Sequence, residues 1–443
     1  MDLSDRVWTE SRAIMRRTLI LPETAFVYTF QYQSVDLGAG VSTTDKAKRY
    51  LGEGSQYGAE QLVHVVLQEG EKSENVLTVG GIGEHLIRQY FAISLGPGLV
   101  QGSSVNPSTY PTETQTVNPT YFTNRAGFYV NDEHTFGRQR ASAGVRMDLD
   151  SLFGLTVNPR AGLVLSPVEK LHLKALYGEA YKAPTIFELY DEWRGNLELT
   201  PEKIRTVELI AELFPLEDAH LSVGAFHSNA DNLILVAPNR NPDQVPIGPE
   251  GQRADYYQNR GDVQWMGMTV LVDAVAADIL RASANYSMTV GSALQPLDNV
   301  STHKVNAALN LDVLDRADVN LRMNWASRVK APETNLYWQP RDRAFEDENY
   351  PYVRARGADG FGPGHFLTHL VVTGRDLFPG DHQLRPQLAI LNLFDARWLA
   401  MGRQAGSGVK PQDPSSVSNP AGFSPPYHPQ PGREIWFQIQ YEY

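Results

Sequence analysis

Hydrophobic and polar residues alternate with a period of two along much of the chain. In residues 281–290 the even positions are apolar, whereas in 304–313 and 318–325 the odd positions are apolar. Successive side chains of a β-strand point to opposite faces, so each of these runs predicts a strand with one apolar and one polar face. The last residues, 434–443, follow the same pattern with Trp436 as an exception.

The lengths of the runs and of their connections predict a membrane barrel. The runs extend for about 10–13 residues, and about 9–11 tilted residues cross a bilayer. Short turns such as 166–170 and 378–381 alternate with long segments such as 96–119 and 331–364. Short turns at one rim and long loops at the other are typical of outer-membrane proteins. We therefore expect an all-β fold, a transmembrane antiparallel β-barrel.

The strand count predicts that this barrel is incomplete. The pattern gives about 17 strands, beginning with 8–20 and 24–37 and ending with 431–443, so the first and last strands both run from the long-loop rim to the short-turn rim. A complete bacterial barrel has an even number of strands and short turns at the periplasmic rim. An odd count predicts that strands are missing at the front, and five more would make a 22-strand barrel. Residues 1–443 are accordingly expected to form one partial barrel domain.

Composition narrows the function. The chain has 443 residues, 42% of them hydrophobic, a net charge of −12 and no cysteine. The absence of cysteine excludes disulfides, thiolate catalysis and Cys-ligated metals, and an acidic chain without a basic cluster argues against a nucleic-acid partner. No apolar run is long enough for a transmembrane helix. Residues 1–20 do not form a secretory signal peptide, so we expect either an intracellular protein or a missing front end.

Several motifs carry a resemblance to a known family. The middle of the chain contains YKAP at 181–184, ELY at 188–190 and GNLELTPE at 195–202, and the end contains LAILNLFDARW at 388–398 and PGREIWFQIQYEY at 431–443. Together these segments resemble the mid-barrel boxes and the last two strands of TonB-dependent outer-membrane receptors. The second box lacks the family's Pro after Asn196, and the family ends more often in Phe or Trp than in Tyr443.

The resemblance implies a function and partners. A protein of this family resides in the outer membrane and takes up a scarce nutrient, most often a ferric siderophore, with energy delivered through the TonB complex. The implied partners are that small-molecule ligand, the TonB complex, outer-membrane lipid and the barrel-assembly machinery, and no cofactor is implied. The family's signal peptide, TonB box and plug domain cannot be located in 1–443, so the plug is expected to be absent.

Candidate ligand-binding residues lie in the long loops, which are rich in aromatic and Arg residues. In the resembling family such residues over the barrel mouth often bind iron–siderophore complexes, and cation–π contacts and charge-assisted hydrogen bonds suit that task. Solvated loop surface or lipopolysaccharide contact is the alternative interpretation. The segment 185–195 has no His, which lowers the expectation of a haem ligand. The candidates are Trp193, Tyr337, Trp338, Arg341, Tyr350 and Tyr352.

Motifs for catalysis or metal binding are not found. The sequence has no G-x-S-x-G elbow and no phosphate-binding loop. His365 and His369 open a predicted strand, where they lie about 13 Å apart at 3.3 Å per residue and cannot share a metal. We therefore expect no catalytic residue, no metal site and no enzyme activity.

Three other interpretations stay open. A passive porin-like channel of 16–18 strands is the first, an outer-membrane barrel enzyme is less favoured, and a soluble β-sandwich is the least favoured. In the barrel interpretation a polar set of strand residues should face a wet lumen. That set is Arg146, Lys174, Asn285, Asn310, Asn320 and Arg322.

Overall fold

A computed structural model describes most of the chain. The described residues are 2–4, 6–20, 27–36, 40–70, 72–95, 115–117, 121–190, 195–238, 255–277, 279–313, 316–332, 338, 358–375, 383–401 and 427–442. Among them, 19 strands form one sheet, and two small sheets of two strands each lie beside it. The main sheet is antiparallel throughout, which confirms the all-β prediction.

A wall of 16 long strands makes up most of this sheet, each pairing with the next along the chain. They are β2 (Val7–Ile20), β4 (Gly40–Gly70), β5 (Ser73–Leu95), β7 (Tyr121–Phe136), β8 (Gln139–Asp150), β9 (Gly154–Val168), β10 (Leu171–Lys182), β11 (Glu202–Leu216), β12 (Ala219–Pro238), β13 (Asp255–Ala276), β14 (Leu280–Gly291), β15 (His303–Val313), β16 (Ala317–Ala326), β19 (His365–Gly374), β20 (Gln383–Leu391) and β23 (Glu434–Glu442).

The remaining elements are not part of this wall. They are β1 (Asp2–Ser4), β3 (Val27–Asp36), β6 (Gln115–Val117), the pair β17 (Val329–Lys330) and β18 (Phe361–Gly362), the pair β21 (Leu399–Met401) and β22 (Tyr427–Pro429), the helix α1 (Ile186–Tyr190) and the 3-10 turn η2 (Ser292–Leu294). No helix in the described part of the chain is long and apolar enough to span a membrane.

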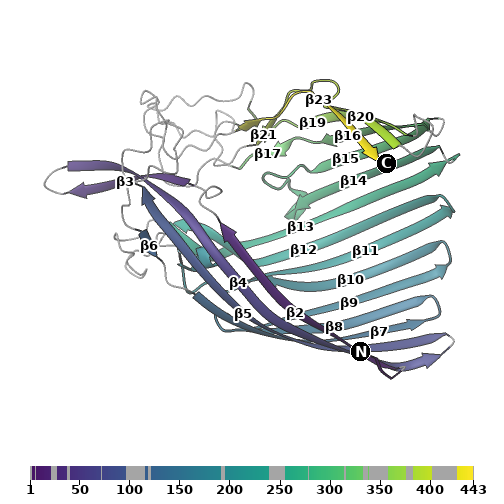
Figure 1. The fold of residues 1–443 in the computed structure, drawn as a ribbon, viewed down its shortest axis with the longest axis horizontal. Helices are drawn as coiled ribbons and strands as arrows, with labels where there is room; N and C mark the ends of the chain where they lie inside the picture. The colour runs from purple at the N-terminus through teal and green to yellow at the C-terminus, as the bar shows by residue number, and fades with distance from the viewer. Residues whose placement is uncertain are drawn as a thin grey trace.

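The wall curves into a deep trough (Figure 1). Short turns join neighbouring strands at one rim, and the long connections leave from the other. Strands β2 and β23 are the two edges of the trough, and no pairing joins them among the described residues.

The predicted strand at 24–37 does not belong to the wall. Its counterpart β3 pairs only with Gly40–Arg49 at the far end of β4, while β2 pairs directly with Gly52–Val65 of β4. Strand β2 therefore runs from the short-turn rim upwards, and the predicted direction of the first strand was wrong. With 16 wall strands the count is even, so the parity argument for five missing strands does not hold. A period-two pattern identifies a strand but not its partner.

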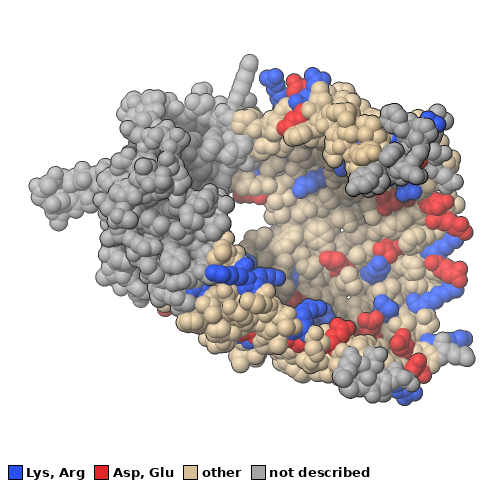
Figure 2. Space-filling model, in the orientation of Figure 1, with Lys and Arg blue, Asp and Glu red and all other residues tan. Residues whose placement is uncertain are grey.

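The two faces of the wall differ in chemistry. One face carries hydrogen-bonded amides, for example Asn306 to Asn285 at 3.0 Å and Asn324 to Asn306 at 2.6 Å. The opposite face exposes large apolar side chains, such as Leu209 at 58% and Phe437 at 67%. Figure 2 views the hollow of the trough and shows Lys, Arg, Asp and Glu side chains on its wall. The concave face is therefore the polar one.

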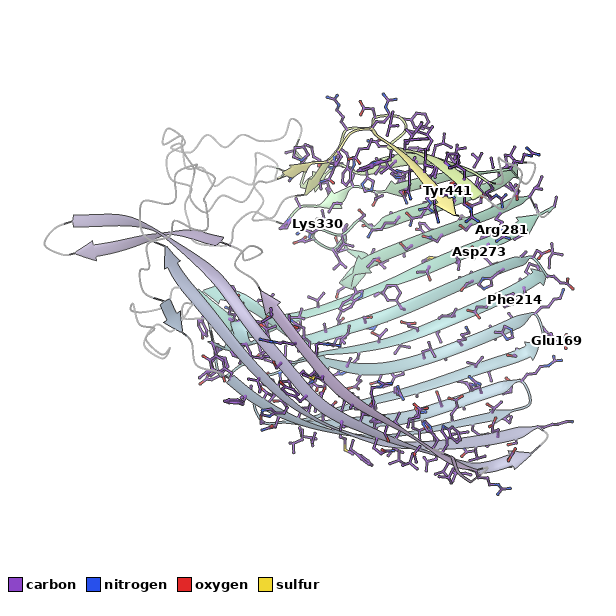
Figure 3. All side chains as sticks on the ribbon, viewed as in Figure 1. Glu169, Phe214, Asp273, Arg281, Lys330 and Tyr441 are labelled. Carbon is purple, nitrogen blue, oxygen red and sulfur yellow. The ribbon has the colours of Figure 1, made fainter. Side chains whose placement is uncertain are left out.

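The register supports the predicted lumen set. Asn310 lies opposite Asn320, and Asn285 lies opposite Asn306, so these amides share one face. The side chain of Arg322 donates to Asn320 at 2.8 Å, and the Lys174 ammonium pairs with Glu212 at 2.7 Å. Figure 3 shows side chains projecting from both faces of the wall where side chains are drawn.

The pairing of β2 with β4 can be tested by disulfide formation, since the chain has no cysteine. Ala13 lies directly opposite Ala59, where the Cα atoms of an antiparallel pair are about 4.5–5.5 Å apart. We expect the double variant Ala13→Cys/Ala59→Cys to form an intramolecular disulfide under mild oxidation, seen as a mobility shift reversed by reductant. The control Ala13→Cys/Val63→Cys places the thiols four residues out of register, about 13 Å apart, and should stay reduced.

Candidate ligand site at the long-loop rim

The segment after β10 folds into a capped turn of helix. Pro184 cannot donate a ladder hydrogen bond, so β10 ends at Lys182. The Glu188 backbone N–H donates to the Thr185 hydroxyl at 3.2 Å, and the Thr185 N–H donates to the Glu188 carboxylate at 2.7 Å. These reciprocal bonds form a capping box that starts α1.

Packing attaches α1 to the tops of β12 and β13. Leu189, Leu199 and Ile234 form a buried cluster, with Phe153, Tyr190 and Tyr257 packed around it. The Asn196 side chain donates to the Tyr257 carbonyl at 2.9 Å, which fixes the second family box to β13. Residues 183–190 and 195–200, which we name the rim brace, are therefore held by apolar burial and by hydrogen bonds to distant strands.

Aromatic rings connect the rim brace to another part of the wall. The ring of Tyr190 stacks on that of Tyr121, at the start of β7, with centroids 3.8 Å apart. Phe187 meets Tyr257 edge to face at 6.2 Å. The brace thus links β7 to β13 and presents aromatic groups at the rim from which the long loops leave.

Ion pairs line the concave face below this rim. Arg125 lies 3.4 Å from Asp150 and 3.7 Å from Glu84, Arg146 lies 2.8 Å from Asp148, and Arg12 lies 3.3 Å from Glu60. Asp148 is 1% exposed and Asp150 is 4% exposed. Buried carboxylates of this kind require paired and hydrogen-bonded partners. We call these residues of β2, β4, β5, β7 and β8 the ionic wall.

Arg88 adds a fourth guanidinium to the ionic wall. It lies directly opposite Tyr121 in the register, four residues along β5 from Glu84, which lies opposite Arg125. The carboxylates of Glu84 and Asp150 already bind Arg125, and Arg88 makes no ion pair with a described residue. Arg88 is partly buried, and it lies close enough to Arg125 to be repelled and to Asp150 to be attracted electrostatically. A guanidinium beside stacked tyrosines is suited to bind an anionic or aromatic ligand group.

Glycines let the large side chains of the ionic wall lie flat. A Cβ on Gly80 would overlap the Tyr129 ring, and a Cβ on Gly127 would lie 2.6 Å from the Asp148 carboxylate. Tyr129 uses this space to donate to Glu60 at 3.2 Å, with the Arg146 guanidinium 5.8 Å from its ring centroid. Gly80 and Gly127 thus leave room on the concave face for the Tyr129 phenol and the Asp148 carboxylate.

The base of the long loop 331–364 is held by a separate ion pair. Arg328 forms two hydrogen bonds with Asp359, at 2.8 and 2.6 Å, and lies 5.3 Å from the Phe361 ring centroid. The hydrogen bonds from Arg328 hold the pKa of Asp359 below its ordinary value. This pair joins β17 to β18 where the loop leaves the wall.

Most of the predicted ligand-binding residues are not among those that the structure describes. Trp193, Tyr337, Arg341, Tyr350 and Tyr352 lie outside the described residues. Trp338 is described: it is 7% exposed, and its carbonyl accepts a hydrogen bond from the Gly360 N–H at 2.7 Å. The ligand-binding role of all six stays a prediction. Within the described part, no group of three or more His, Asp or Glu side chains could hold a metal ion.

Sequence reasoning missed Arg88, Arg125 and Tyr121. Their register in β5 and β7 places them on the polar face, but the polar neighbours Gln89 and Asn124 interrupt the alternation in the sequence. Their convergence depends on the register between strands some 40 residues apart in sequence, such as the His85–Asn124 contact with a separation of 39. That register cannot be read from one sequence.

A curved antiparallel wall with a polar hollow, an apolar exterior and long loops at one rim defines the class of outer-membrane β-barrel proteins. A family model described as TonB dependent receptor-like, beta-barrel matches residues 17–370. The chain belongs to this family of TonB-dependent receptors and resides in the outer membrane. Its homologues are transporters and receptors, not enzymes.

Individual relatives agree with this assignment. The vitamin B12 transporter BtuB of Vibrio vulnificus is 30% identical over 124 residues, which is 28% of this chain and 19% of BtuB. A mutant of the ferric enterobactin receptor PfeA from Pseudomonas aeruginosa superposes with a TM-score of 0.61 at 16% identity, covering 99% of this chain and 67% of PfeA. The ferric-catecholate import receptor Fiu from E. coli K12 gives 0.63 at 14%, covering 99% and 62%. The structural matches show the fold, and the chain spans less than two thirds of Fiu.

Glycine 80 offers a test of the ionic wall. Gly80→Ala should push the Tyr129 ring away from Glu60, and overpacking of this kind lowers the free energy of unfolding by about 1–3 kcal/mol. Urea titration of the folded protein in lipid vesicles measures the change. Gly83 in the same strand is the matched control, because a Cβ there would meet nothing within 4 Å. Equal effects of the two substitutions would contradict the proposed packing.

The Arg328–Asp359 pair predicts a pH dependence of the loop base. A carboxyl group whose pKa is lowered by folding stabilises the folded state above its ordinary pKa of 3.8, and this contribution is lost as pH falls through the lowered value. At pH 7 we expect the amide hydrogens of residues 358–362 to exchange with solvent faster in the Asp359→Asn variant than in the unmodified protein. Once the pH has fallen through the lowered pKa of Asp359, the two proteins should exchange alike, after correction for intrinsic rates. A difference that persists unchanged at low pH would contradict the assignment.

Proposed function

We propose that this chain is the barrel part, residues 1–443, of a receptor that takes up a ferric siderophore and is energised through TonB in its intact form. Membership of the family supports uptake of a nutrient by transport across the outer membrane. The siderophore assignment goes further and rests on the chemistry at the long-loop rim.

The guanidinium of Arg88 opposite Tyr121, which forms no ion pair with a described residue, is the observation that carries the siderophore assignment. Ferric catecholate complexes are anionic and aromatic, so a guanidinium and stacked phenol rings complement them in charge and shape. The names of two structural relatives, a ferric enterobactin receptor and a ferric-catecholate import receptor, agree with this ligand class for those proteins. Vitamin B12, the cargo named for BtuB, offers less negative charge to Arg88.

The partners of the intact receptor follow from the same proposal. The small-molecule ligand would enter between the long loops and reach the ionic wall below the rim brace. The TonB complex would act from the short-turn side, and the final strand β23 would engage the assembly machinery during insertion. Movement of ligand through the hollow would require a plug domain, which we propose is supplied outside residues 1–443.

Ligand titration tests the siderophore assignment. The full 443-residue chain, folded in detergent, should quench its tryptophan fluorescence saturably on addition of ferric enterobactin and not of cyanocobalamin. Arg88→Gln removes a charged hydrogen-bond donor and should weaken binding roughly tenfold or more. Arg322→Gln, on the amide-lined part of the hollow, is the matched control and should leave the affinity unchanged.

Other outcomes of the titration would count against the proposal. Equal weakening by Arg88→Gln and Arg322→Gln would remove Arg88 from the site. Saturable binding of cyanocobalamin alone would replace the siderophore with a corrinoid.

A passive channel is the second candidate. It is favoured by one observation: β2 and β23 run antiparallel to each other among 16 wall strands, the geometry in which two edges can pair. Ohmic conductance of the chain in planar bilayers, unaffected by ferric enterobactin, would support the channel and oppose the receptor.

A further inference from the structure

An apolar groove crosses the convex face of the wall. Its lining comes from β9 to β13, and its cavity volume is about 490 Å³. The side chains that form it are Leu163, Leu165, Leu173, Leu209, Val223 and Met268, with Ala175, Ala211 and Ala225 between them. The residue next to Ala175, Lys174, turns its ammonium to the opposite face, where it pairs with Glu212 at 2.7 Å.

The groove arises because small residues alternate with large ones across neighbouring strands. Leu163, Ala175, Leu209, Ala225 and Met268 lie directly opposite one another in successive strands. In the neighbouring row Leu165, Leu173, Ala211 and Val223 do the same. The three alanines form the floor, because their neighbours in each row extend further from the wall. The large residues beside them stay exposed, with Leu209 at 58% and Val223 at 40%.

The dimensions of the groove fit one hydrocarbon chain. It spans five strands, and four strand spacings of about 4.8 Å give a length of roughly 19 Å. This length is close to that of an extended acyl chain of a membrane phospholipid. Since this face is the membrane-facing surface of an outer-membrane protein, the groove is continuous with the lipid phase.

A cation lies between the groove and the short-turn rim. Lys170 sits in the short turn between β9 and β10, three residues or about 10 Å along the strand from Leu173. Its ammonium donates to the Pro215 carbonyl at 3.3 Å and forms no ion pair with a described residue. The neighbouring Glu169 is already paired with Arg138 at 2.5 Å. Lys170 is therefore available to a phosphate at the level of the lipid headgroups.

We propose that the groove holds a single phospholipid from the leaflet next to the short-turn rim, with one acyl chain across β9 to β13 and its phosphate at Lys170. This is a lipid site on the outside of the wall, independent of the nutrient site in the hollow. A protein partner fits less well, because the groove offers no hydrogen-bonding side chain and lies where lipid already contacts the wall.

Native mass spectrometry of the full chain tests the proposal with phosphatidylglycerol as the probe. The unmodified protein should retain one phosphatidylglycerol after detergent exchange. The double variant Ala211→Leu/Ala225→Leu fills the floor with apolar groups and should reduce the retained lipid at least tenfold. Lys170→Gln should reduce the retained lipid only severalfold, since the groove for the acyl chain remains.

A matched control separates filling of the groove from a general effect of added bulk. Ala284 and Ala307 are directly opposite each other on the same convex face, outside the groove. Ala284→Leu/Ala307→Leu should leave the retained lipid unchanged. Equal loss in both double variants, or no loss in either, would overturn the proposal.

Photolabelling of the unmodified protein gives a second readout that needs no variant. A phosphatidylglycerol with a photoactivatable acyl chain should label peptides that contain residues 163–175 and 209–225. Labels spread evenly over all convex-face strands would overturn the proposal, as would labelling of the groove by lipopolysaccharide and not by phosphatidylglycerol.

Discussion

The absence of water in the bilayer core governs this structure. Every backbone N–H and C=O at membrane depth must be paired within the protein, because an unpaired group in hydrocarbon costs several kcal/mol. The wall meets this requirement by continuous pairing from β2 to β23, including 23 partner positions between β4 and β5 that only one register shift interrupts. Only the outer edges of β2 and β23 lack a neighbouring wall strand among the described residues, so these edges are where the constraint is not met by the described sheet.

The same constraint sorts the side chains. Because β-strands alternate, each strand sends half of its residues to the hollow and half to the lipid. In the hollow, the ionic wall of β2 to β8 faces across to amides of β14 to β16, so one side carries charge and the other carries neutral hydrogen-bonding groups. On the convex face from β9 to β13 the side chains that form the groove are apolar, and among them only residue size varies. Large and small aliphatic residues can therefore create relief there without adding polarity.

The sequence could predict the faces but not their contacts. Alternation in 281–290 and 304–313 is a local property, and β14 and β15 follow it. The strand at 24–37 was assigned to the wall because nothing in its pattern distinguishes a hairpin outside the wall from a wall strand. The pairing of Arg125 with Asp150 depends on cross-strand register, and the stacking of Tyr121 on Tyr190 depends on a packed loop. Five of the six loop residues proposed for ligand binding lie outside the described part, so the site near Arg88 rests on other residues.

The stacking of Tyr190 on Tyr121 has a mechanical consequence. It joins two points of an arc that are otherwise connected only by the intervening strands from β7 to β13. A tie across an arc fixes its radius, so this part of the mouth resists dilation. The arc from β14 to β16 has a connection of its own, because Asp298 and Ser301, between β14 and β15, bridge to β17.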